Sequence, residues 1–481
     1  MNRENNNYAG KRKTSFAAFS FVLACLAVLS ITHSVYAVDW PTYNYDNARS
    51  GSTAEALILN DLNQAWVYHA PSPPQRAWGD DPPWDAWSYS GAVPMRDFDT
   101  ALFVTVVGDN VYFGSSVTNS VHCLDITNGA QKWFYLTNGA VRFPPSYDNG
   151  KLYFGSDDGY VYCLNAADGS FVWKYSPTGD SRVLFNNGKL TTMWPVRSGT
   201  AVMEGKVYFA AGLVPWKSSY LCSVDAATGV ASGTGLFKST VGSTPTGAIL
   251  ASTDNLYLTE GRFNPIRYNR SNAGSPTTIG SGAGVFALLT SDGPSTGFVF
   301  GSGRFSAHGY RLETSSDRIA SVSDGKYMVV GGGFSYVITE TFGVETTKGY
   351  RTNIVNQLKA INRSTGGTSW SVTCDTRRFS LILAGDVLFT GGVGKVVAHS
   401  TTDGSVLWSK PLNGQVRGLA AANGNLFAGT DTGKIYMFGR PFLKADFNKN
   451  GIVDLVDLMI FVDNFLDCTD PVTQGCEQVS L

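Results

Sequence analysis

Short apolar segments that end in glycine recur along the chain at intervals of about 40 residues. The first two are Val111–Gly114 and Leu152–Gly155, and each precedes a turn, a second apolar segment and a tryptophan, Trp133 or Trp173. Apolar and polar residues alternate within these segments, which predicts short β-strands, and the glycines permit the positive φ angles of tight turns. Four short strands in a repeat of about 40 residues are typical of a β-propeller blade.

Further units extend the pattern along the chain and predict an all-β, eight-bladed propeller. Their segments start at Val207, Leu256, Phe298, Tyr327, Val387 and Leu426. The middle units lack the closing tryptophan, so seven blades are the alternative. The last unit ends at Phe438 without a closing strand, and Ala65–Tyr68 resembles that strand. We therefore predict that the N-terminal strand closes the propeller and protects its sheet edges.

The repeated side chains predict the interfaces between blades. Trp133 and Trp173 are expected to pack against the adjacent blade, because one four-stranded sheet cannot bury its own apolar residues. Cys123 and Cys163 occupy equivalent strand positions and are expected to be buried free thiols. The histidines after residue 37 share no motif and are expected to be surface or strand residues rather than catalytic bases: His69, His122, His308 and His399.

Two features depart from the repeat. Arg142, Arg197 and Arg417 precede inner strands of different units, and we expect them to line a solvated central channel rather than form an anion site. The segment from Arg76 to Trp87 is rich in tryptophan, aspartate and proline and precedes the first full repeat. We expect it to fold onto the propeller as a lid, with a carbohydrate- or protein-binding surface as the alternative.

The composition fits a large, folded all-β protein. The 481 residues include 53 glycines, and 13% are aromatic, which excludes a mostly disordered chain. The 37 basic and 38 acidic side chains nearly cancel. The charge balance therefore gives no reason to expect nucleic acid or an anionic membrane as a partner.

Residues 1–37 have the pattern of a signal peptide. Lys11–Lys13 precede an apolar run from Phe16 to Ile31, which ends near the small-x-small pattern Val35–Ala37. The run is shorter than the roughly 20 apolar residues that a membrane-spanning helix needs. We expect cleavage after Ala37 and no integral membrane segment in the mature chain. The protein would be secreted, in the periplasm, at the cell surface or outside a bacterial cell.

A calcium-binding loop is predicted in the C-terminal segment, residues 441–481, after the propeller of residues 38–440. Oxygen-bearing side chains stand at positions 1, 3, 5, 9 and 12 of a twelve-residue loop, with glycine at position 6 and a carbonyl ligand at position 7. The predicted ligands are Asp446, Asn448, Asn450, Ile452, Asp454 and Asp457. An apolar helix is expected over residues 455–465. The alternative to the calcium loop is an Asp- and Asn-rich turn that caps this helix. In the same segment, Cys468 and Cys476 are the favoured disulfide pair.

The repeats resemble the pyrroloquinoline-quinone-type propeller repeat over about residues 39–440. The resemblance rests on the apolar strand ending in glycine, the Asp-Gly and Ala-Thr-Gly turns and the closing tryptophan. Asp39–Pro41 and Asp46–Gly51 are similar to the start of this family, and Met193–Gly199 is similar to a segment of its exported members. The resemblance implies the propeller fold but not a quinone, because many members bind none.

Enzymatic members of that family carry further motifs. Quinone-dependent alcohol dehydrogenases have a disulfide between adjacent cysteines, and this sequence has no adjacent cysteines and no Cys-x-x-Cys-His heme motif. The sequence therefore identifies no catalytic or quinone-binding residue. We expect calcium as the cofactor and no pyrroloquinoline quinone.

The C-terminal loop resembles a dockerin type I repeat, because Asp457 stands at position 12 where a regular EF-hand has glutamate. Dockerins use two such loops, and one is visible here. The resemblance implies attachment or assembly at the cell surface, with a cohesin-like module as a possible partner. Together these features favour a secreted, non-catalytic propeller that binds a protein or glycan. The alternatives are a divergent quinone-dependent alcohol or sugar dehydrogenase, a polysaccharide-active protein and a scaffold resembling the propeller lipoprotein of outer-membrane assembly.

Overall fold

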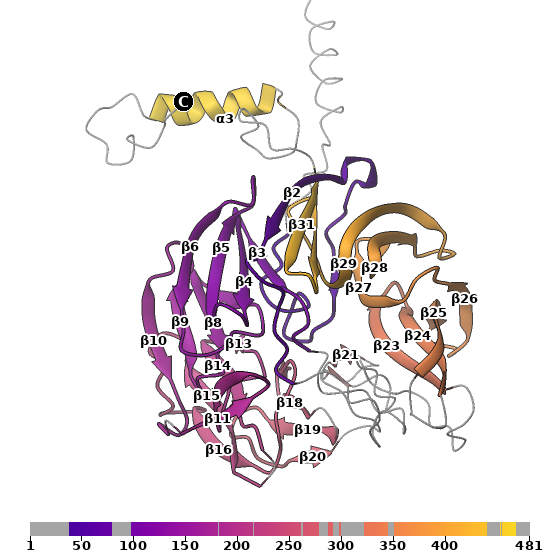
Figure 1. Cartoon of the computed structure of the whole chain (residues 1–481). Helices are drawn as coiled ribbons and strands as arrows, with labels where there is room; N and C mark the ends of the chain where they lie inside the picture. The colour runs from indigo at the N-terminus through magenta and orange to yellow at the C-terminus, as the bar shows by residue number, and fades with distance from the viewer. Residues whose placement is uncertain are drawn as a thin grey trace, which may run out of the picture. The chain divides into compact units, whose positions relative to one another are not determined.

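The computed structural model describes residues 38–78, 98–180, 182–214, 216–260, 263–278, 287–291, 298–299, 322–344, 351–439, 453 and 455–467. The regular structure in these ranges consists mostly of antiparallel strands (Figure 1). None of the helices in them has both the length and the apolar character needed to traverse a membrane. The predicted signal peptide and the pair Cys468 and Cys476 lie outside the described residues.

The first half of the chain forms four antiparallel sheets of four strands each, as the repeat predicts. The first two contain β3 (Val104–Val107), β4 (Asn110–Ser115), β5 (Ser120–Asp125), β6 (Gln131–Leu136), β7 (Ser146–Asp148), β8 (Lys151–Gly155), β9 (Val161–Asn165) and β10 (Phe171–Tyr175). The next two contain β13 (Ala201–Met203), β14 (Lys206–Ala211), β15 (Ser219–Asp225), β16 (Phe237–Val241), β17 (Leu250–Ala251), β18 (Asn255–Glu260), β19 (Phe263–Asn269) and β20 (Thr277–Thr278). A hairpin of β11 (Val183–Asn186) and β12 (Lys189–Thr192) interrupts this series.

The second half contains a two-stranded, a four-stranded and a seven-stranded sheet. The first two are formed by β21 (Thr290–Ser291) with β22 (Phe298–Val299), and by β23 (Val322–Gly331), β24 (Phe334–Val344), β25 (Arg351–Asn362) and β26 (Thr368–Thr373). The seven-stranded sheet has the order β1 (Ser52–Thr53), β27 (Arg378–Ala384), β28 (Val387–Ser400), β29 (Val406–Ala422), β30 (Asn425–Thr430), β31 (Lys434–Gly439) and β2 (Asn63–His69). A 3-10 helix, η1 (Leu59–Asp61), precedes β2.

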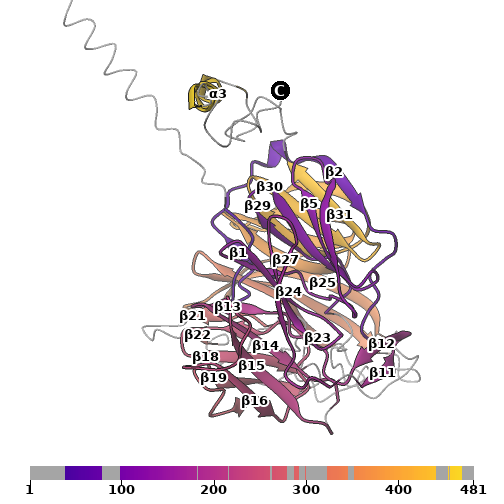
Figure 2. The ribbon, with the colours of Figure 1, turned by 90° about the vertical axis from the view of Figure 1, so that its left-hand side faces the viewer.

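The seven-stranded sheet joins two repeats through the long strand β29. The first part of β29 pairs with β28 and the second part with β30, with a shift in register beside Val416. The N-terminal strand β2 pairs with β31, so that Trp66 lies opposite Met437 (Figure 2). The strand predicted at Ala65–Tyr68 therefore supplies the outer strand of the last unit.

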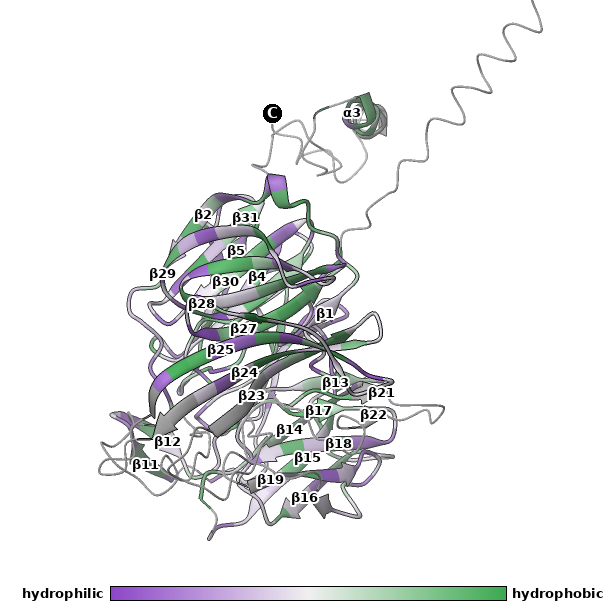
Figure 3. Ribbon diagram, turned by 90° about the vertical axis from the view of Figure 1, so that its right-hand side faces the viewer, coloured by the Kyte–Doolittle hydropathy of each residue, from purple (hydrophilic) through white to green (hydrophobic). Residues whose placement is uncertain are grey.

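The apolar core lies where neighbouring sheets face each other. The innermost strands are in contact, β3 with β7, β7 with β13, β13 with β17, and β29 with β3. Figure 3 shows hydrophobic residues along β27 and β28, and all seven residues of β27 are buried. The alternation of apolar residues predicted from the sequence therefore serves the contacts between sheets.

One predicted unit has a different register from the others. The segment starting at Val111 lies in the second strand of its sheet, β4, and the equivalents at Leu152 and Val207 lie in β8 and β14. The segment starting at Tyr327 lies in β23, the first strand of its sheet, so the predicted equivalence is wrong there. Both strands of this hairpin are apolar and meet at glycines, Gly331–Gly333, so the first strand has the same pattern as the second.

The closing tryptophans pack on the next unit, as predicted. Each ring covers the glycine of a turn in that unit, and its indole N–H donates to a carbonyl of the same turn at 2.8–3.1 Å. The pairs are Trp66 with Gly129, Trp133 with Gly169, Trp173 with Gly229 and Trp370 with Gly404. This contact explains why glycine and tryptophan recur together at a fixed spacing, because a side chain at the glycine would occupy the space of the ring.

Replacing Gly229 by alanine is expected to destabilise the protein more than replacing Gly205 by alanine. The two glycines have φ angles of +70° and +69°, so alanine meets the same backbone strain of about 1–2 kcal/mol at both. A Cβ at Gly229 would lie 2.4 Å from Trp173, whereas nothing lies within 4 Å of one at Gly205. We expect a further loss of about 1–3 kcal/mol at Gly229, measured by urea unfolding; equal losses would contradict a tight tryptophan–glycine contact.

The cysteine and histidine predictions agree with the described residues. Cys123 and Cys163 are fully buried free thiols, and burial raises their pKa values to about 12 and about 11. His122 and His399 are buried in strands β5 and β28, and burial lowers the pKa of both imidazoles. His69 lies exposed in β2, and His308 lies outside the described residues.

A helix follows the predicted calcium loop. It is α3 (Leu455–Asp467), close to the range of 455–465 expected from the sequence. Of the six predicted calcium ligands, the structure describes Asp457, whose side chain is buried in the first turn of α3. The other five lie outside the described residues.

Candidate functional site

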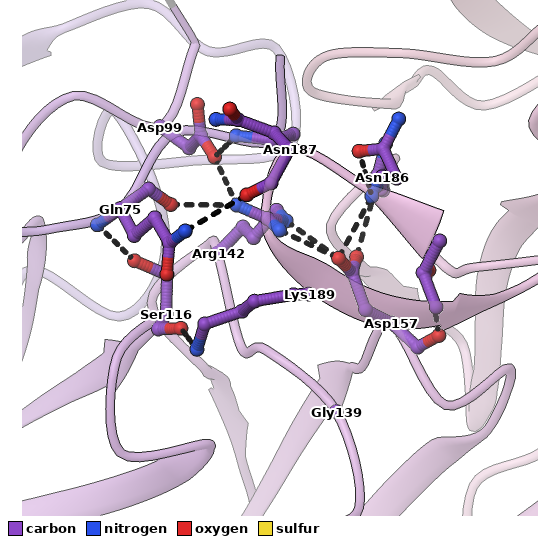
Figure 4. Close-up of polar contacts among 12 residues, drawn as sticks. Gln75, Asp99, Ser116, Gly139, Arg142, Asp157, Asn186, Asn187 and Lys189 are labelled. Carbon is purple, nitrogen blue, oxygen red and sulfur yellow. Dashed lines mark hydrogen bonds and ion pairs between the residues drawn. The ribbon is translucent and has the colours of Figure 1, made fainter. Parts of the chain in front are cut away.

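A buried aspartate in the turn after β8 binds two arginines from other segments (Figure 4). The Arg142 guanidinium donates to Asp157 Oδ2 from Nε at 2.9 Å and from Nη2 at 2.6 Å. The Arg197 guanidinium donates from Nε to Oδ1 at 2.9 Å and from Nη2 to Oδ2 at 2.8 Å. The side chains of all three residues are at most 3% exposed. Such charge-assisted, paired contacts are the strong form of hydrogen bond in a protein interior.

A second aspartate completes the charge balance. Arg142 Nη1 also donates to Asp99 Oδ2 and to the backbone carbonyl of Gln75. The Ala77 N–H donates to the same Asp99 oxygen at 2.7 Å. Two guanidinium groups and two carboxylates therefore form a network without net charge, which we call the Asp157 network: Asp99, Arg142, Asp157 and Arg197.

The two carboxyl groups of the network differ in acidity. Burial opposes ionisation of Asp157, but the charges of Arg142 and Arg197 outweigh it and hold the pKa of Asp157 well below its usual range. Burial raises the pKa of Asp99, although Arg142 and Arg197 partly offset the effect. Asp157 therefore stays ionised near neutral pH and contacts both guanidinium groups.

The prediction that Arg142, Arg197 and Arg417 are solvated channel walls is wrong for the first two. Arg142 and Arg197 are 6% and 1% exposed and share Asp157. Burying a guanidinium is unfavourable unless a carboxylate accompanies it, and the repeat pattern does not reveal that Asp157 and Asp99 supply these carboxylates. Arg417 contacts a different set of residues.

The β11–β12 hairpin and residues 72–78 are tied to each other beside the network (Figure 4). Gln75 Nε2 donates to the Asn187 carbonyl at 2.8 Å, and Asn187 Nδ2 donates to the Arg76 carbonyl at 2.9 Å. Lys189 Nζ donates to the Ser116 carbonyl, which lies in the first sheet's β4–β5 turn. Arg76–Trp78, the described part of the predicted lid, therefore packs inward, and Ala77 is fully buried. The rest of that segment lies outside the described residues.

A recess lies beside the Asp157 network, where strands β23, β27 and β29 meet two loops. The space in it that a water-sized sphere can occupy is about 20 Å³, and about 410 Å³ is empty when the part open to solvent is counted. The lining residues are Tyr43, Asn44, Thr100, Phe103, Tyr327, Phe379, Ser380, Leu381, Ile382, Arg417, Gly418 and Leu419. Thr100 follows Asp99 in the chain, so one loop contributes to both the network and the recess. We call this the Arg417 recess.

The charged side chain of the Arg417 recess is held against an aromatic ring. The Arg417 guanidinium lies 4.5 Å from the centre of the Phe379 ring. Its Nε and Nη2 donate to Gln415 Oε1 at 3.2 Å and 2.8 Å. Phe103 and Tyr43 form an edge-to-face pair at 5.2 Å on another wall. The recess thus combines a fixed positive charge with flat apolar surfaces.

The lining of the recess contains few groups that transfer protons. The described residues of the lining include no histidine, cysteine, lysine, aspartate or glutamate. Burial raises the pKa of Tyr43 further above its usual value, so its phenol keeps its proton near neutral pH. Within the described ranges, no group of three or more histidine, cysteine, aspartate or glutamate side chains is placed to hold a metal ion.

Sequence reasoning named Arg142, Arg197 and Arg417 as inner residues and missed Asp99, Thr100 and Phe379. Nothing in the local sequence marks these three, because each acts through partners far away in the chain. Asp157 stands in an Asp-Asp-Gly turn, where aspartate is expected for turn geometry alone. Its burial is the property that distinguishes it from the exposed turn aspartates.

Comparison with known proteins finds one curated relative and several solved structures that are similar to this chain. A curated relative, the tetrathionate hydrolase of Acidithiobacillus ferrooxidans, is 26% identical over 98 residues, which are 20% of this chain and 17% of that protein. The chain thus spans less than a fifth of the length of that relative. Among solved structures, BamB from Moraxella catarrhalis has a TM-score of 0.46 at 12% identity, over 79% of this chain and 99% of that chain. A europium-containing methanol dehydrogenase has a TM-score of 0.48 at 13% identity, over 83% and 98%.

The family assignment comes from the repeats themselves. The family model PQQ_2, described as outer membrane protein assembly factor BamB, matches residues 47–233 and 355–440, more than half of the chain. The matched ranges contain the tryptophan–glycine contacts of the first and last units and the Asp157–Arg197 pair. The chain therefore belongs to the PQQ-like β-propeller family that is described as outer membrane protein assembly factor BamB.

Proposed function

We propose that this protein is an exported, non-catalytic β-propeller that binds a partner protein in the bacterial cell envelope. Membership of a family named for outer membrane protein assembly supports a protein partner over a glycan. The predicted signal peptide supports export, with cleavage after Ala37, which the N-terminal sequence of the mature protein would check. The C-terminal segment is proposed to be a dockerin-like tail for surface attachment or assembly, with a cohesin-like module as its candidate partner.

The lining of the Arg417 recess carries this proposal. A reaction in this recess would need a base, a nucleophile or a group that accepts electrons. The lining offers one arginine, two tyrosines, hydroxyl and amide groups and apolar side chains. These groups bind and orient a ligand, and none of them takes up a proton near neutral pH.

The charge pattern supports a propeller that does not hold pyrroloquinoline quinone. The quinone is a tricarboxylate, so a site for it needs several available cations. Arg142 and Arg197 are already paired with Asp157, and Arg377, beside the recess, is paired with Glu340 at 2.9 Å. Binding the quinone through these side chains would leave buried carboxylates without partners.

A dye-reduction assay tests the absence of dehydrogenase activity. The full-length protein, mixed with pyrroloquinoline quinone and calcium, is expected to leave an electron-accepting dye unreduced when alcohols or aldoses are added. A known quinone-dependent dehydrogenase serves as the positive control. Dye reduction that requires both this protein and the quinone would instead establish a divergent dehydrogenase.

We further propose a closed ring of eight blades. The β21–β22 sheet is counted as one blade, and the seven-stranded sheet as two that share β29. The pairing of β2 with β31 and the contact of β29 with β3 support closure. An experimental structure with seven blades, or with an open ring, would reject this arrangement.

We propose that the C-terminal loop binds calcium through the Ile452 carbonyl and five side chains. These side chains are those of Asp446, Asn448, Asn450, Asp454 and Asp457. Calorimetric titration of the full-length protein with calcium is expected to show a dissociation constant of about 10⁻⁴–10⁻³ M, the range of extracellular modules. Asp446→Ala is expected to abolish this heat, because it removes the first ligand. Asp168→Ala, in an exposed turn outside the loop, is the control, and an unchanged heat in Asp446→Ala would reject the site.

A further inference from the structure

The β11–β12 hairpin, a two-stranded sheet separate from those of the blades (Figure 3), exposes three large apolar side chains. Val183, Phe185 and Leu190 are 59%, 75% and 60% exposed. Phe185 lies opposite Leu190, and Val183 is two residues from Phe185 in β11. Because side chains alternate along a strand, all three lie on one face of the hairpin. We call this surface, formed by Val183, Phe185 and Leu190, the hairpin patch.

The hairpin is held in place by contacts that leave the hairpin patch uncovered. The Thr192 N–H and the Thr191 hydroxyl both donate to the Asp157 carbonyl at 3.1 Å. Lys189 Nζ donates to the Val117 carbonyl at 3.1 Å. The patch is therefore presented by an anchored pair of strands, so a partner that binds it orders little additional chain. Adjacent apolar side chains exposed in this way are typical of an interaction site.

Strand β11 also has a free edge, because in the described part of the chain it pairs with β12 and with no other strand. Asn186 and Lys189 flank the turn of the hairpin and form a hydrogen-bonded pair. Since such pairs alternate along antiparallel strands, the backbone groups of Val183 and Phe185 point away from β12. No described residue donates to these two carbonyls or accepts from these two N–H groups. Such an edge accepts a further strand, because its backbone groups repeat at the spacing of an extended chain.

The charge of the hairpin favours an acidic partner. Residues 182–192 contain two cationic side chains, Arg182 and Lys189, and no aspartate or glutamate. Arg182 pairs with Asp180. Lys189 donates to carbonyl and amide oxygens, and no carboxylate of the described residues lies within ion-pair distance of it. The hairpin therefore carries a net positive charge, which attracts a segment with acidic side chains.

We propose that β11 binds an extended, acidic segment of a partner protein as a third strand of the hairpin sheet. The backbone groups of the segment pair with those of Val183 and Phe185. Its apolar side chains, at alternate positions, pack on the hairpin patch, and the acidic side chains between them face the side of the sheet that carries Lys189. This inference rests on the proposed function, and it names the surface and the kind of segment through which the partner protein binds.

Synthetic peptides test the proposal on the full-length protein. The probe is a seven-residue peptide, blocked at both ends, in which glutamate alternates with valine and phenylalanine. Fluorescence anisotropy of the labelled peptide is expected to show saturable binding. The same peptide with N-methyl groups on alternate backbone nitrogens, which no longer donate to β11, should bind at least tenfold more weakly. A peptide with lysine in place of glutamate should also bind at least tenfold more weakly.

Two matched variants locate the binding surface. Phe185→Ser is expected to weaken binding of the glutamate peptide at least tenfold, because it removes the largest side chain of the hairpin patch. Phe134→Ser, at a phenylalanine of β6 that is 54% exposed, serves as the control and should bind the peptide like the wild type. If Phe185→Ser fails to fold, the comparison of the methylated and unmethylated peptides decides the question.

The proposal is overturned by any of three results. They are no saturable binding of the glutamate peptide at millimolar concentration, equal binding of the methylated and unmethylated peptides, and wild-type affinity in folded Phe185→Ser. Self-association of the wild type that Phe185→Ser abolishes would also overturn it, because a second copy would then occupy the patch. Failure of peptide binding rejects this surface alone, whereas dye reduction by the quinone-loaded protein rejects the non-catalytic function.

Discussion

Replacing Asp157 by asparagine is expected to lower the free energy of unfolding by about 3–5 kcal/mol. The substitution keeps the shape of the side chain but removes the negative charge between Arg142 and Arg197, both of which are buried. Two guanidinium groups would then remain in the interior with only Asp99 to balance them. Urea unfolding of the purified variant and the wild type measures the difference.

The pH dependence of the free energy of unfolding, measured for the wild type and Asp157→Asn, provides a second readout. Arg142 and Arg197 hold the pKa of Asp157 below its value in the unfolded chain despite burial, so its contribution to stability is complete above the unfolded pKa of about 4. That contribution is lost as the pH falls below this value. Between pH 7 and pH 3 the wild type should therefore lose more stability than Asp157→Asn.

An exposed ion pair serves as the control for the Asp157 prediction. Asp180 binds Arg182 at 2.6 Å, but Arg182 is largely exposed to solvent. Asp180→Asn is expected to leave the urea midpoint unchanged within error, because solvent screens such pairs. If Asp157→Asn and Asp180→Asn had equal effects, the Asp157 network would not be a stabilising feature of the fold.

Replacing Trp173 by alanine is also expected to lower the free energy of unfolding by about 3–5 kcal/mol. The ring is 7% exposed, covers Gly229 and donates from Nε1 to the Ala226 carbonyl at 3.0 Å. The substitution leaves a cavity between two sheets and a carbonyl without its partner. Thermal and urea unfolding, followed by circular dichroism, measure the loss.

A second tryptophan tests whether the expected loss of stability comes from the packing of Trp173 or from the removal of any tryptophan. Trp216 is 76% exposed, so Trp216→Ala removes a residue of the same kind without opening a cavity. It is expected to change the unfolding midpoint little. Similar losses in the two variants would show that the contact between sheets contributes little to stability.

The sequence predicted the strands and their interfaces because each repeat carries its own local pattern. The Trp173–Gly229 contact joins two positions that recur in several units, so the pattern marks both at once. The predicted register of the unit at Tyr327 was wrong because both strands of that hairpin are apolar and both adjoin the glycines of its turn. Local pattern alone does not distinguish the two strands of such a hairpin.

The candidate site was less predictable because its residues are distant in sequence. Arg142 and Arg197 could be predicted as residues that precede inner strands, but their burial depends on distant carboxylates. Asp99 is 43 residues from Arg142, and Asp157 is 40 residues from Arg197. Arg417 differs from them, because its side-chain hydrogen-bond partner among the described residues is the neutral Gln415, which only the folded arrangement reveals. The calcium site differs from these arginines, because its ligands lie close together in the sequence. The site remains a prediction from sequence.

Calorimetric titration of the full-length protein with pyrroloquinoline quinone, in the presence of calcium, tests the central claim most directly. The account of a non-catalytic binding propeller predicts no saturable heat from the quinone, because Arg142, Arg197 and Arg377 are committed to carboxylates. Stoichiometric binding of the quinone would contradict it and would indicate a dehydrogenase.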